Sequence, residues 1–305
     1  MTTAQPSSQP SSQPTSPLTA VRNWVVGARL KTLPATLAPI AVGTAVAHSL
    51  GGVDWWRTLW TLVFALGFVL GTNFLNDYSD GIRGTDDHRV GPVRLVGSGQ
   101  ASPRQVLRDG LVLYALGLLA GIVLTVTVSW WLLVLAVACA LGGWFYTGGS
   151  RPYGYRSFGE ISLFLYHGPI AVGATVFIQL ERVPALALAA SVPVGILVCA
   201  LLVTNNLRDI PTDRAAGKIT VAVRLGERRT RIFYLLCVGG AFLTALALAF
   251  SRPGVLLVLA ALPVAVFPIR RVMSGARGAD LVAALEHTCL LLLAHGTLLA
   301  IGLAL

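Results

Sequence analysis

The chain has 305 residues, of which 55% are hydrophobic and only 12% are charged, and its mean hydropathy is +0.72. A soluble domain carries roughly a quarter charged residues, so this composition excludes an ordinary soluble fold and indicates an all-helical membrane protein. The net charge of +10 does not indicate a nucleic-acid-binding protein, because the basic residues lie in short loops between apolar runs.

The N-terminal stretch 1–20 is predicted to be a disordered cytoplasmic tail that precedes a transmembrane domain over 21–305. Residues 1–19 are rich in Ser, Gln and Pro and contain no charged side chain. That composition cannot build a packed core. The tail also lacks the basic start and adjoining apolar run of a signal peptide, so we expect the first span to direct insertion.

Nine apolar runs are long enough to cross a bilayer core of about 30 Å, which needs roughly 20 helical residues. In chain order the predicted spans are about 33–51, 57–77, 109–127, 130–148, 160–180, 184–207, 231–250, 254–272 and 282–305. With nine spans, 20 of the 23 Lys and Arg residues fall on the side of the N terminus. This asymmetry predicts a cytoplasmic N terminus and a C terminus outside.

A cluster of polar residues ends the second span, in the sequence GTNFLNDYSDGIRG (71–84). Asn76, Asp77 and Asp80 follow Asn73 at offsets of 3, 4 and 7. These offsets place all four residues on one face of a helix.

A second cluster ends the sixth span, in the sequence NNLRDIPTDRAAGK (205–218). Asp209 and Asp213 follow Asn205 at offsets of 4 and 8. The topology places both clusters on the cytoplasmic side, so we interpret them as parts of one site.

The residue types of the two clusters favour magnesium and phosphate chemistry. Carboxylates held close together repel one another unless a divalent cation neutralises them, and oxygen ligands without His or Cys suit Mg²⁺. Neighbouring basic residues would take up the remaining phosphate charge. They are Arg83, Arg208, Arg214 and Lys218. A diphosphate bound at the mouth of a transmembrane cavity implies a lipid diphosphate, with its tail between the helices and its carbon–oxygen bond as the one that breaks.

Two interpretations without a functional role compete with this one. Asp and Asn at a helix end are often caps, but caps favour N termini, whereas these clusters come at helix C termini. Exposed Asp–Arg pairs in loops contribute only about 0–1 kcal/mol, and they do not explain two aligned polar faces.

The two clusters resemble the aspartate-rich motifs of the UbiA superfamily of intramembrane aromatic prenyltransferases. RGTDDHRVGPVRLVGSG, YTGGSRPYGYRSFGE (146–160) and GARLKTLPATLAP (27–39) also resemble members of that superfamily, and the resemblance covers nearly the whole chain after residue 20. It implies a nine-helix bundle around a central cavity. The first cluster reads NxxxDxxD rather than the family's NxxxDxxxD, which leaves direct ligation by Asp80 less secure.

The resemblance implies transfer of a long-chain prenyl group from prenyl diphosphate to 1,4-dihydroxy-2-naphthoate. Carbon dioxide and diphosphate are lost, and the product is demethylmenaquinone, made in a bacterial cell membrane. The expected Mg²⁺ ligands are Asp77, Asp80, Asp209 and Asp213, with Asp77, Asp209 and Tyr146 as catalytic residues. The expected contacts to the diphosphate are Asn73, Asn76, Arg83, Asn205, Arg208, Arg214 and Lys218.

Other residues are candidates on chemical grounds. Phe74, Tyr78 and Tyr146 could stabilise an allylic cation with their ring faces. Lys31 and Arg151 could bind the carboxylate of the aromatic acid. A single histidine, His88, could contact the diphosphate.

Two other functions stay open at this stage. A related enzyme could use a different acceptor, such as 4-hydroxybenzoate. An ion-coupled secondary transporter would also contain carboxylates in the membrane, but near the bilayer midplane rather than at helix ends beside basic loops. The sequence gives no indication of the prenyl chain length or the oligomeric state.

Overall fold

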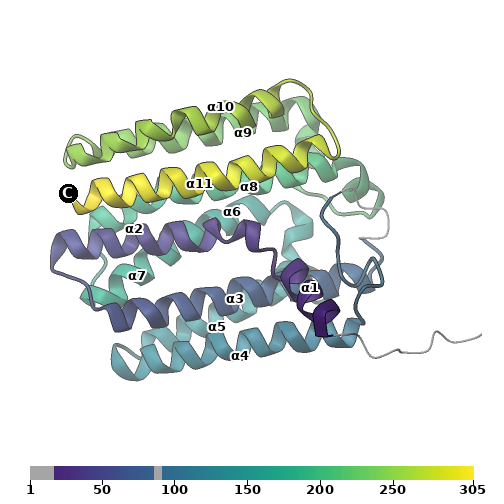
Figure 1. The fold of residues 1–305 in the computed structure, drawn as a ribbon, viewed down its shortest axis with the longest axis horizontal. Helices are drawn as coiled ribbons and strands as arrows, with labels where there is room; N and C mark the ends of the chain where they lie inside the picture. Colours follow the sequence, from purple (N-terminus) through teal and green to yellow (C-terminus); the bar gives the residue numbers. More distant parts are fainter. Residues whose placement is uncertain (1–16, 86–90) are drawn as a thin grey trace, which may run out of the picture.

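The computed structural model describes residues 17–85 and 91–305, and every regular element within those ranges is helical (Figure 1). In chain order the elements are α1 (Pro17–Ala28), η1 (Leu30–Thr32), α2 (Pro34–Leu50), α3 (Trp55–Ile82), α4 (Pro103–Thr127), α5 (Trp131–Thr147), η2 (Tyr153–Arg156), α6 (Gly159–Leu165), η3 (Tyr166–Ile170), α7 (Ala171–Leu180), α8 (Ala185–Ala215), α9 (Val221–Leu248), η4 (Pro253–Ala261), α10 (Leu262–Met273) and α11 (Asp280–Ala304). Residues 1–16 of the expected tail, and His88, lie outside the described residues.

Each predicted span corresponds to a helix or to a continuous run of helices. Within the described ranges, seven segments are long and apolar enough to cross a membrane. They are α3, α4, the run Gly159–Leu180, α8, α9, the run Pro253–Met273 and α11. The bent pair of Val21–Thr32 and α2 makes an eighth span if its two helices are taken together, and α5 is an apolar helix of 17 residues. The all-helical membrane class is therefore confirmed, and the number of spans agrees approximately.

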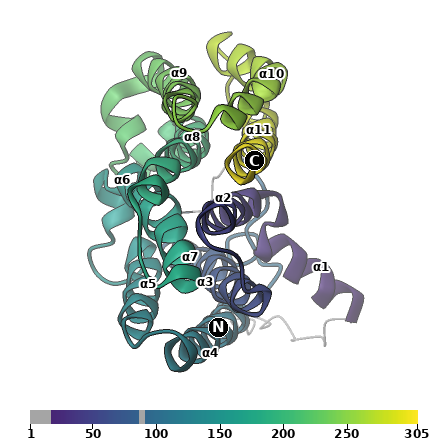
Figure 2. The ribbon, with the colours of Figure 1, turned by 90° about the vertical axis from the view of Figure 1, so that its left-hand side faces the viewer.

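The long helices lie side by side in Figure 1 and are seen nearly end-on in Figure 2. In the end-on view α8, α9, α10 and α11 form one group, α3, α4 and α5 form another, and α2 and α7 lie between them. A large buried apolar cluster joins α2, α8, α9 and α11. The two groups enclose the cavity described below.

Helices α3 and α4 come close together because both carry glycine at the contact. A Cβ atom added to Gly67 would lie 2.7 Å from the Cα atom of Gly117. Small residues allow this close approach of two backbones, which increases van der Waals contact in a membrane interior where burial alone gives little driving force.

Helices α3 and α8 continue beyond the ends of their predicted spans. The second predicted span ends at residue 77, whereas α3 ends at Ile82, and the sixth ends at residue 207, whereas α8 ends at Ala215. Hydropathy stops at the first polar residues, but the backbone remains helical. Both clusters therefore lie inside the last turns of long helices.

Helix α1 was not among the predicted elements. It begins at Pro17, so residues 17–20 of the expected tail are helical, and the bend between the Val21–Thr32 segment and α2 is 51°. At the bend Arg29 has a left-handed backbone (φ 51°, ψ 51°), which is uncommon for a residue other than glycine. The side chain of Asn73 donates a hydrogen bond to the carbonyl oxygen of Ala28 (3.1 Å) and so fixes the end of α1.

Candidate active site

One cavity of about 790 Å³ runs between the two groups of helices. Residues of α2, α3, α5, α7, α8 and α11 form most of its wall, and most of that wall is apolar. The charged residues of the lining occur in loops or terminal turns at the end of the bundle where α3 and α8 finish and α11 begins. They are Arg29, Lys31, Asp80, Arg94, Lys218 and Glu286.

Three of the four residues of the first cluster face the cavity. Asn73, Asn76 and Asp80 line the cavity, as their helical spacing predicts. Asp77 is only 1% exposed and points to the loop after α3, where its two carboxylate oxygens accept hydrogen bonds from the backbone N–H groups of Leu95 (2.9 Å) and Val96 (3.0 Å). In this structure Asp77 therefore fixes the loop that covers the cavity.

The second cluster places Asn205 on the cavity wall and its two carboxylates just behind. Arg208 donates to both carboxylate oxygens of Asp209, through Nε (2.7 Å) and Nη2 (2.8 Å), and Nη2 also donates to the side-chain oxygen of Asn205 (2.8 Å). The side chains of Arg208 and Asp209 are 1% and 8% exposed. Asp213 forms an ion pair with Lys218 (3.6 Å), and Lys218 lines the cavity.

Tyr155, on η2, joins the two clusters. Its hydroxyl donates a hydrogen bond to Asp80 (2.8 Å), and its ring centroid lies 5.2 Å from the Nζ atom of Lys218, the partner of Asp213. Burial raises the pKa of the Tyr155 phenol, and the charge of Asp80 raises it further, so the hydroxyl remains a donor. The sequence pattern gave no reason to select Tyr155 from the tyrosines of residues 146–160.

The donor set agrees with magnesium in chemistry, although the side chains are not arranged around a metal. Among residues 17–85 and 91–305, no three His, Cys, Asp or Glu side chains lie close enough to bind one ion. The four buried aspartates instead bind Arg208, Lys218, Tyr155 and backbone N–H groups. Because these partners are all positive or hydrogen-bond donors, a divalent cation can replace some of them at the same oxygens.

One buried donor is suited to a phosphate oxygen. The Nη1 atom of Arg208 is buried and has no hydrogen-bond partner in the part of the chain that the structure describes. The loop at Gly91 passes directly over it, since a Cβ atom there would lie 2.9 Å from the guanidinium carbon. A side chain at residue 91 would therefore have to displace this guanidinium. A buried guanidinium with a spare N–H group is a strong donor to an anion.

The other predicted basic residues occupy different places. Arg83 does not line the cavity, and it donates hydrogen bonds to the carbonyl oxygens of Thr147 and Gly149 at the end of α5. Arg214 is exposed on the last turn of α8. Arg151 lines a separate surface pocket, apart from the cavity. Lys31 does line the cavity and pairs with Glu286 (2.6 Å).

Two arginines in the lining were not predicted. Arg29, from the bend before α2, and Arg94, from the loop after α3, both face the cavity at its charged end. The Nη2 atom of Arg29 donates to the backbone oxygen of Asn73 (3.2 Å), which holds it beside the first cluster. Both arginines lie in segments that resemble the UbiA superfamily, Arg29 in GARLKTLPATLAP and Arg94 in RGTDDHRVGPVRLVGSG. The direction in which their side chains point, however, depends on the tertiary fold.

The three candidate aromatic residues differ in whether they line the cavity. Tyr146 lines the cavity, with its ring edge-on to Tyr153 at 5.5 Å between centroids. Phe74 is fully buried beside Trp24, and Tyr78 packs against the same apolar cluster. Neither Phe74 nor Tyr78 lines the cavity, so their rings contribute to packing.

The family model of the UbiA prenyltransferases matches residues 36–294, which include both clusters and most of the cavity wall. This chain belongs to the UbiA prenyltransferase family.

Similar proteins come from bacteria and from animals. The chain is 48% identical to the 1,4-dihydroxy-2-naphthoate octaprenyltransferase of Mycobacterium tuberculosis, over 92% of this chain and 97% of that one. It is 35% identical to the enzyme of the same name from Escherichia coli, over 76% and 77% of the two chains. It is 32% identical to UbiA prenyltransferase domain-containing protein 1 of Danio rerio, over 81% and 74%.

Solved structures of UbiA homologues share the fold. The apo structure of a homologue from Aeropyrum pernix superposes with a TM-score of 0.65 at 16% identity, over 90% of this chain and 97% of that one. A homologue from Archaeoglobus fulgidus bound to GPP and Mg²⁺ gives a TM-score of 0.61 at 14% identity, over 91% and 99%. The UbiA architecture expected from the sequence is therefore confirmed.

Proposed function

We propose that this UbiA-family protein is an enzyme of menaquinone synthesis that transfers a prenyl group from a prenyl diphosphate to 1,4-dihydroxy-2-naphthoate. The bond from C1 of the prenyl group to the diphosphate oxygen breaks, and a ring carbon then bonds to C1 of the allylic cation. The carboxyl group leaves as carbon dioxide, and because the step uses no oxidant the product is the hydroquinone form of demethylmenaquinone. The observation that carries this proposal is an apolar cavity with both Asn/Asp clusters at one end. The relative in M. tuberculosis, named for this reaction, supports it.

The clusters would hold the diphosphate at the charged end of the cavity. Asp77, Asp80, Asp209 and Asp213 are the expected ligands of Mg²⁺, which when bound makes the diphosphate a better leaving group. The spare N–H group of Arg208 and the ammonium of Lys218 neutralise the remaining charge. The Archaeoglobus homologue that binds GPP and Mg²⁺ is consistent with this arrangement.

Asn73, Asn76 and Asn205 would position the diphosphate rather than neutralise it. All three line the cavity. The side-chain oxygen of Asn76 accepts a hydrogen bond from the hydroxyl of Thr147 (2.6 Å), so its amide nitrogen is oriented as a donor. Arg83 and Arg214 lie off the cavity wall, so we assign them to the loop structure and to the surface charge.

The acceptor acid would bind beside the diphosphate, at the same charged end. Lys31 and Arg29 face the cavity there, and either can pair with a carboxylate. Tyr146 presents its ring to the cavity and is placed to stabilise positive charge on the prenyl group. The apolar wall keeps water from the allylic cation, so that the naphthoate ring captures it. Arg151 lies in another pocket, and we do not assign it to the acid.

The location that we propose is a bacterial cell membrane, with the N terminus and the charged end of the cavity on the cytoplasmic side. Positively charged loops favour the cytoplasm, and 20 of the 23 basic residues are on that side. The C terminus would then lie outside.

The test is an incubation of purified protein with Mg²⁺, prenyl diphosphates, 1,4-dihydroxy-2-naphthoate and 4-hydroxybenzoate together, followed by mass analysis of products. We expect prenylated, decarboxylated naphthoate. Prenylated hydroxybenzoate as the only product would show that the enzyme uses 4-hydroxybenzoate as its acceptor. Uptake of a solute by proteoliposomes, driven by a proton or sodium gradient and without diphosphate release, would indicate a transporter.

The variant Asp209→Asn tests the role of the second cluster in the same assay. Removing this charge should lower product formation at least about 100-fold, as loss of a group that stabilises developing charge does. Asp280→Asn is the matched control, because Asp280 is 63% exposed at the start of α11 and lies off the cavity. Equal activity of both variants would contradict the proposed site.

A further inference from the structure

The cavity continues from the charged end along most of the length of α3. Its lining on α3 extends from Asp80 back to Thr61. At 1.5 Å per residue these positions are about 28 Å apart along the helix axis. The cavity is therefore deep enough to cover most of a bilayer core, and the clusters occupy only one end.

An apolar cluster, which we call the floor, lines the far end of the cavity. Leu124, Leu132 and Ile178 are buried together there, each at most 5% exposed, and come from α4, α5 and α7. Phe64 and Leu135 pack against them, and all five residues line the cavity. The hydroxyl of Thr61 donates to the carbonyl oxygen of Arg57 (2.7 Å), which satisfies its polar group at the apolar floor.

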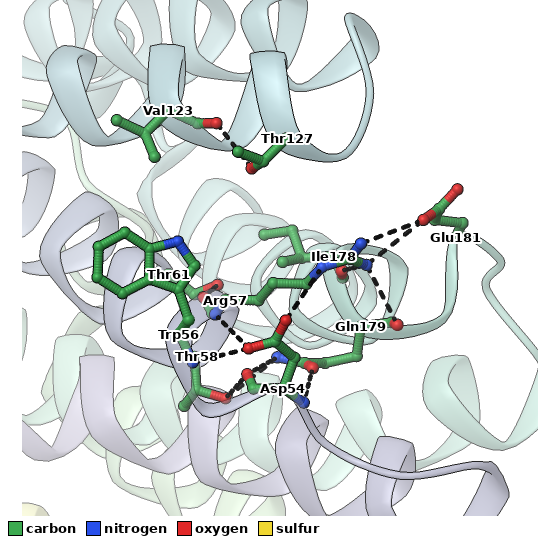
Figure 3. Close-up of polar contacts among 10 residues, drawn as sticks. All are labelled: Asp54, Trp56, Arg57, Thr58, Thr61, Val123, Thr127, Ile178, Gln179 and Glu181. Atoms are coloured by element: carbon green, nitrogen blue, oxygen red, sulfur yellow. Dashed lines mark hydrogen bonds and ion pairs between the residues drawn. The ribbon is translucent and has the colours of Figure 1, made fainter.

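A set of polar contacts just beyond the floor ties the start of α3 to the end of α7 (Figure 3). The Nη1 atom of Arg57 donates to the carbonyl oxygen of Ile178 (2.8 Å), and its guanidinium lies 3.4 Å from Glu181. Gln179 accepts from the backbone N–H group of Asp54 (2.8 Å) and donates to its carbonyl oxygen (3.3 Å). An arginine side chain that donates to the last carbonyl oxygens of a helix also interacts favourably with the negative end of the helix dipole. These contacts hold the floor in place.

We infer that the prenyl tail lies along α3 and that the floor formed by Leu124, Leu132 and Ile178 sets the tail length at which further isoprene units stop adding to binding. This inference rests on the proposed prenyl transfer. An extended isoprene unit adds about 5 Å, from four carbon–carbon bonds of about 1.5 Å in a zigzag. A tail of about five or six units would therefore reach from the clusters to the floor.

A competing path exists at the charged end, where the cavity is also lined by η1 and by Leu285 of α11. A tail that left the protein there would never approach the floor. The two paths make opposite predictions for substitutions at the floor, because only a tail along α3 contacts Leu132.

The experiment measures kcat/KM for a series of prenyl diphosphates from two to eight isoprene units. For the wild-type protein, kcat/KM should rise with each unit and level off at about five or six units, since each buried unit removes more apolar surface from water. Leu132→Trp should move the levelling point to shorter tails. It should lower kcat/KM for the five-unit substrate by about tenfold and leave the two-unit substrate unchanged.

Leu132→Ala is the second variant, because it removes volume and introduces no clash. It should move the levelling point to longer tails. Leu133→Trp is the matched control: Leu133 is the next residue on α5, is 44% exposed and does not line the cavity. It should behave as the wild type.

The outcomes separate this inference from the proposed function. If the wild-type protein prenylates naphthoate but neither Leu132 variant changes the dependence on tail length, the floor does not limit the tail and the inference is wrong. Activity of Leu132→Trp with the two-unit substrate shows that the variant is folded. If it loses that activity, the Leu132→Ala series alone decides. No product from the wild-type protein with any tail would instead contradict the proposed function.

Discussion

The hydroxyl of Tyr155 is the only described side-chain group that donates to Asp80 in this structure, and its ring faces the lysine that pairs with Asp213. Tyr155→Phe keeps the ring and removes the donor. We expect kcat/KM to fall about tenfold, because a hydrogen bond to a charged group contributes about 1.5–3 kcal/mol. A Mg²⁺ titration of activity measures whether the loss affects metal dependence.

Tyr155→Leu is the comparison for that variant, since it also removes the ring beside Lys218. A larger loss for leucine than for phenylalanine would assign part of the effect to the contact between ring and ammonium. Full activity of the phenylalanine variant would show that the hydrogen bond from this hydroxyl to Asp80 is not needed for catalysis.

Arg208 is the second residue with a clear energetic prediction. Its pair with Asp209 is buried on both sides, so removing Arg208 takes away a guanidinium that binds both oxygens of a buried carboxylate. Arg208→Ala should lower the free energy of unfolding by about 3–5 kcal/mol. Thermal unfolding in detergent measures this, with Arg214→Ala as the exposed control on the same helix. Arg208→Lys should recover only part of the loss, because an ammonium cannot bind both carboxylate oxygens as a guanidinium does.

The sequence predicted the cavity-facing residues Asn73, Asn76, Asp80 and Asn205, because helical spacing fixes which residues share a face. It did not predict that Asp77 binds the backbone of residues 95 and 96, nor that Arg83 caps α5. Those contacts join segments that are distant in sequence, and only the packing of the loops decides them. The same reason explains why Tyr155, Arg29 and Arg94 were missed.

At the scale of a helix, the contact between α3 and α4 depends on the absence of side chains. Gly67→Ala would place its Cβ atom 2.7 Å from the backbone of Gly117, so the two helices would have to move apart. We expect a loss of about 1–3 kcal/mol in the free energy of unfolding. Gly239→Ala on α9 is the matched control, because a Cβ atom there has no neighbour within 4 Å. Thermal unfolding should show a lower Tm for the first variant and an unchanged or higher Tm for the second.

The helical elements were predicted more accurately in their apolar parts than at their ends. Hydropathy located a helix or a run of helices at each expected span, because about 20 apolar residues in a row have few alternatives to a membrane helix. It ended α3 and α8 too early, since the burial of Asp80 and Asp213 is not visible in composition. It also missed α1, whose residues 17–28 are too few to span a bilayer and pack instead beside Phe74.

At the scale of the whole molecule, the distribution of basic residues predicts the topology. A green fluorescent protein fused to the N terminus should fluoresce, and alkaline phosphatase fused to the C terminus should be active, because the first folds in the cytoplasm and the second outside it. Moving the phosphatase to the loop after α8 should abolish its activity. An active phosphatase in that loop would reverse the orientation and place the clusters outside.

The cavity wall includes both the beginning and the end of the described chain. Lys31 pairs with Glu286 across 255 positions, and Val282, Leu285 and Cys289 of α11 complete the wall opposite α2. During synthesis the N-terminal helices enter the membrane first, so a nascent chain that has not yet released α11 has an open side where the acceptor acid would bind. Catalytic competence should therefore arise only after α11 has joined the other helices. A protein expressed as two pieces, divided between α10 and α11, should regain activity when the pieces are made together in one cell.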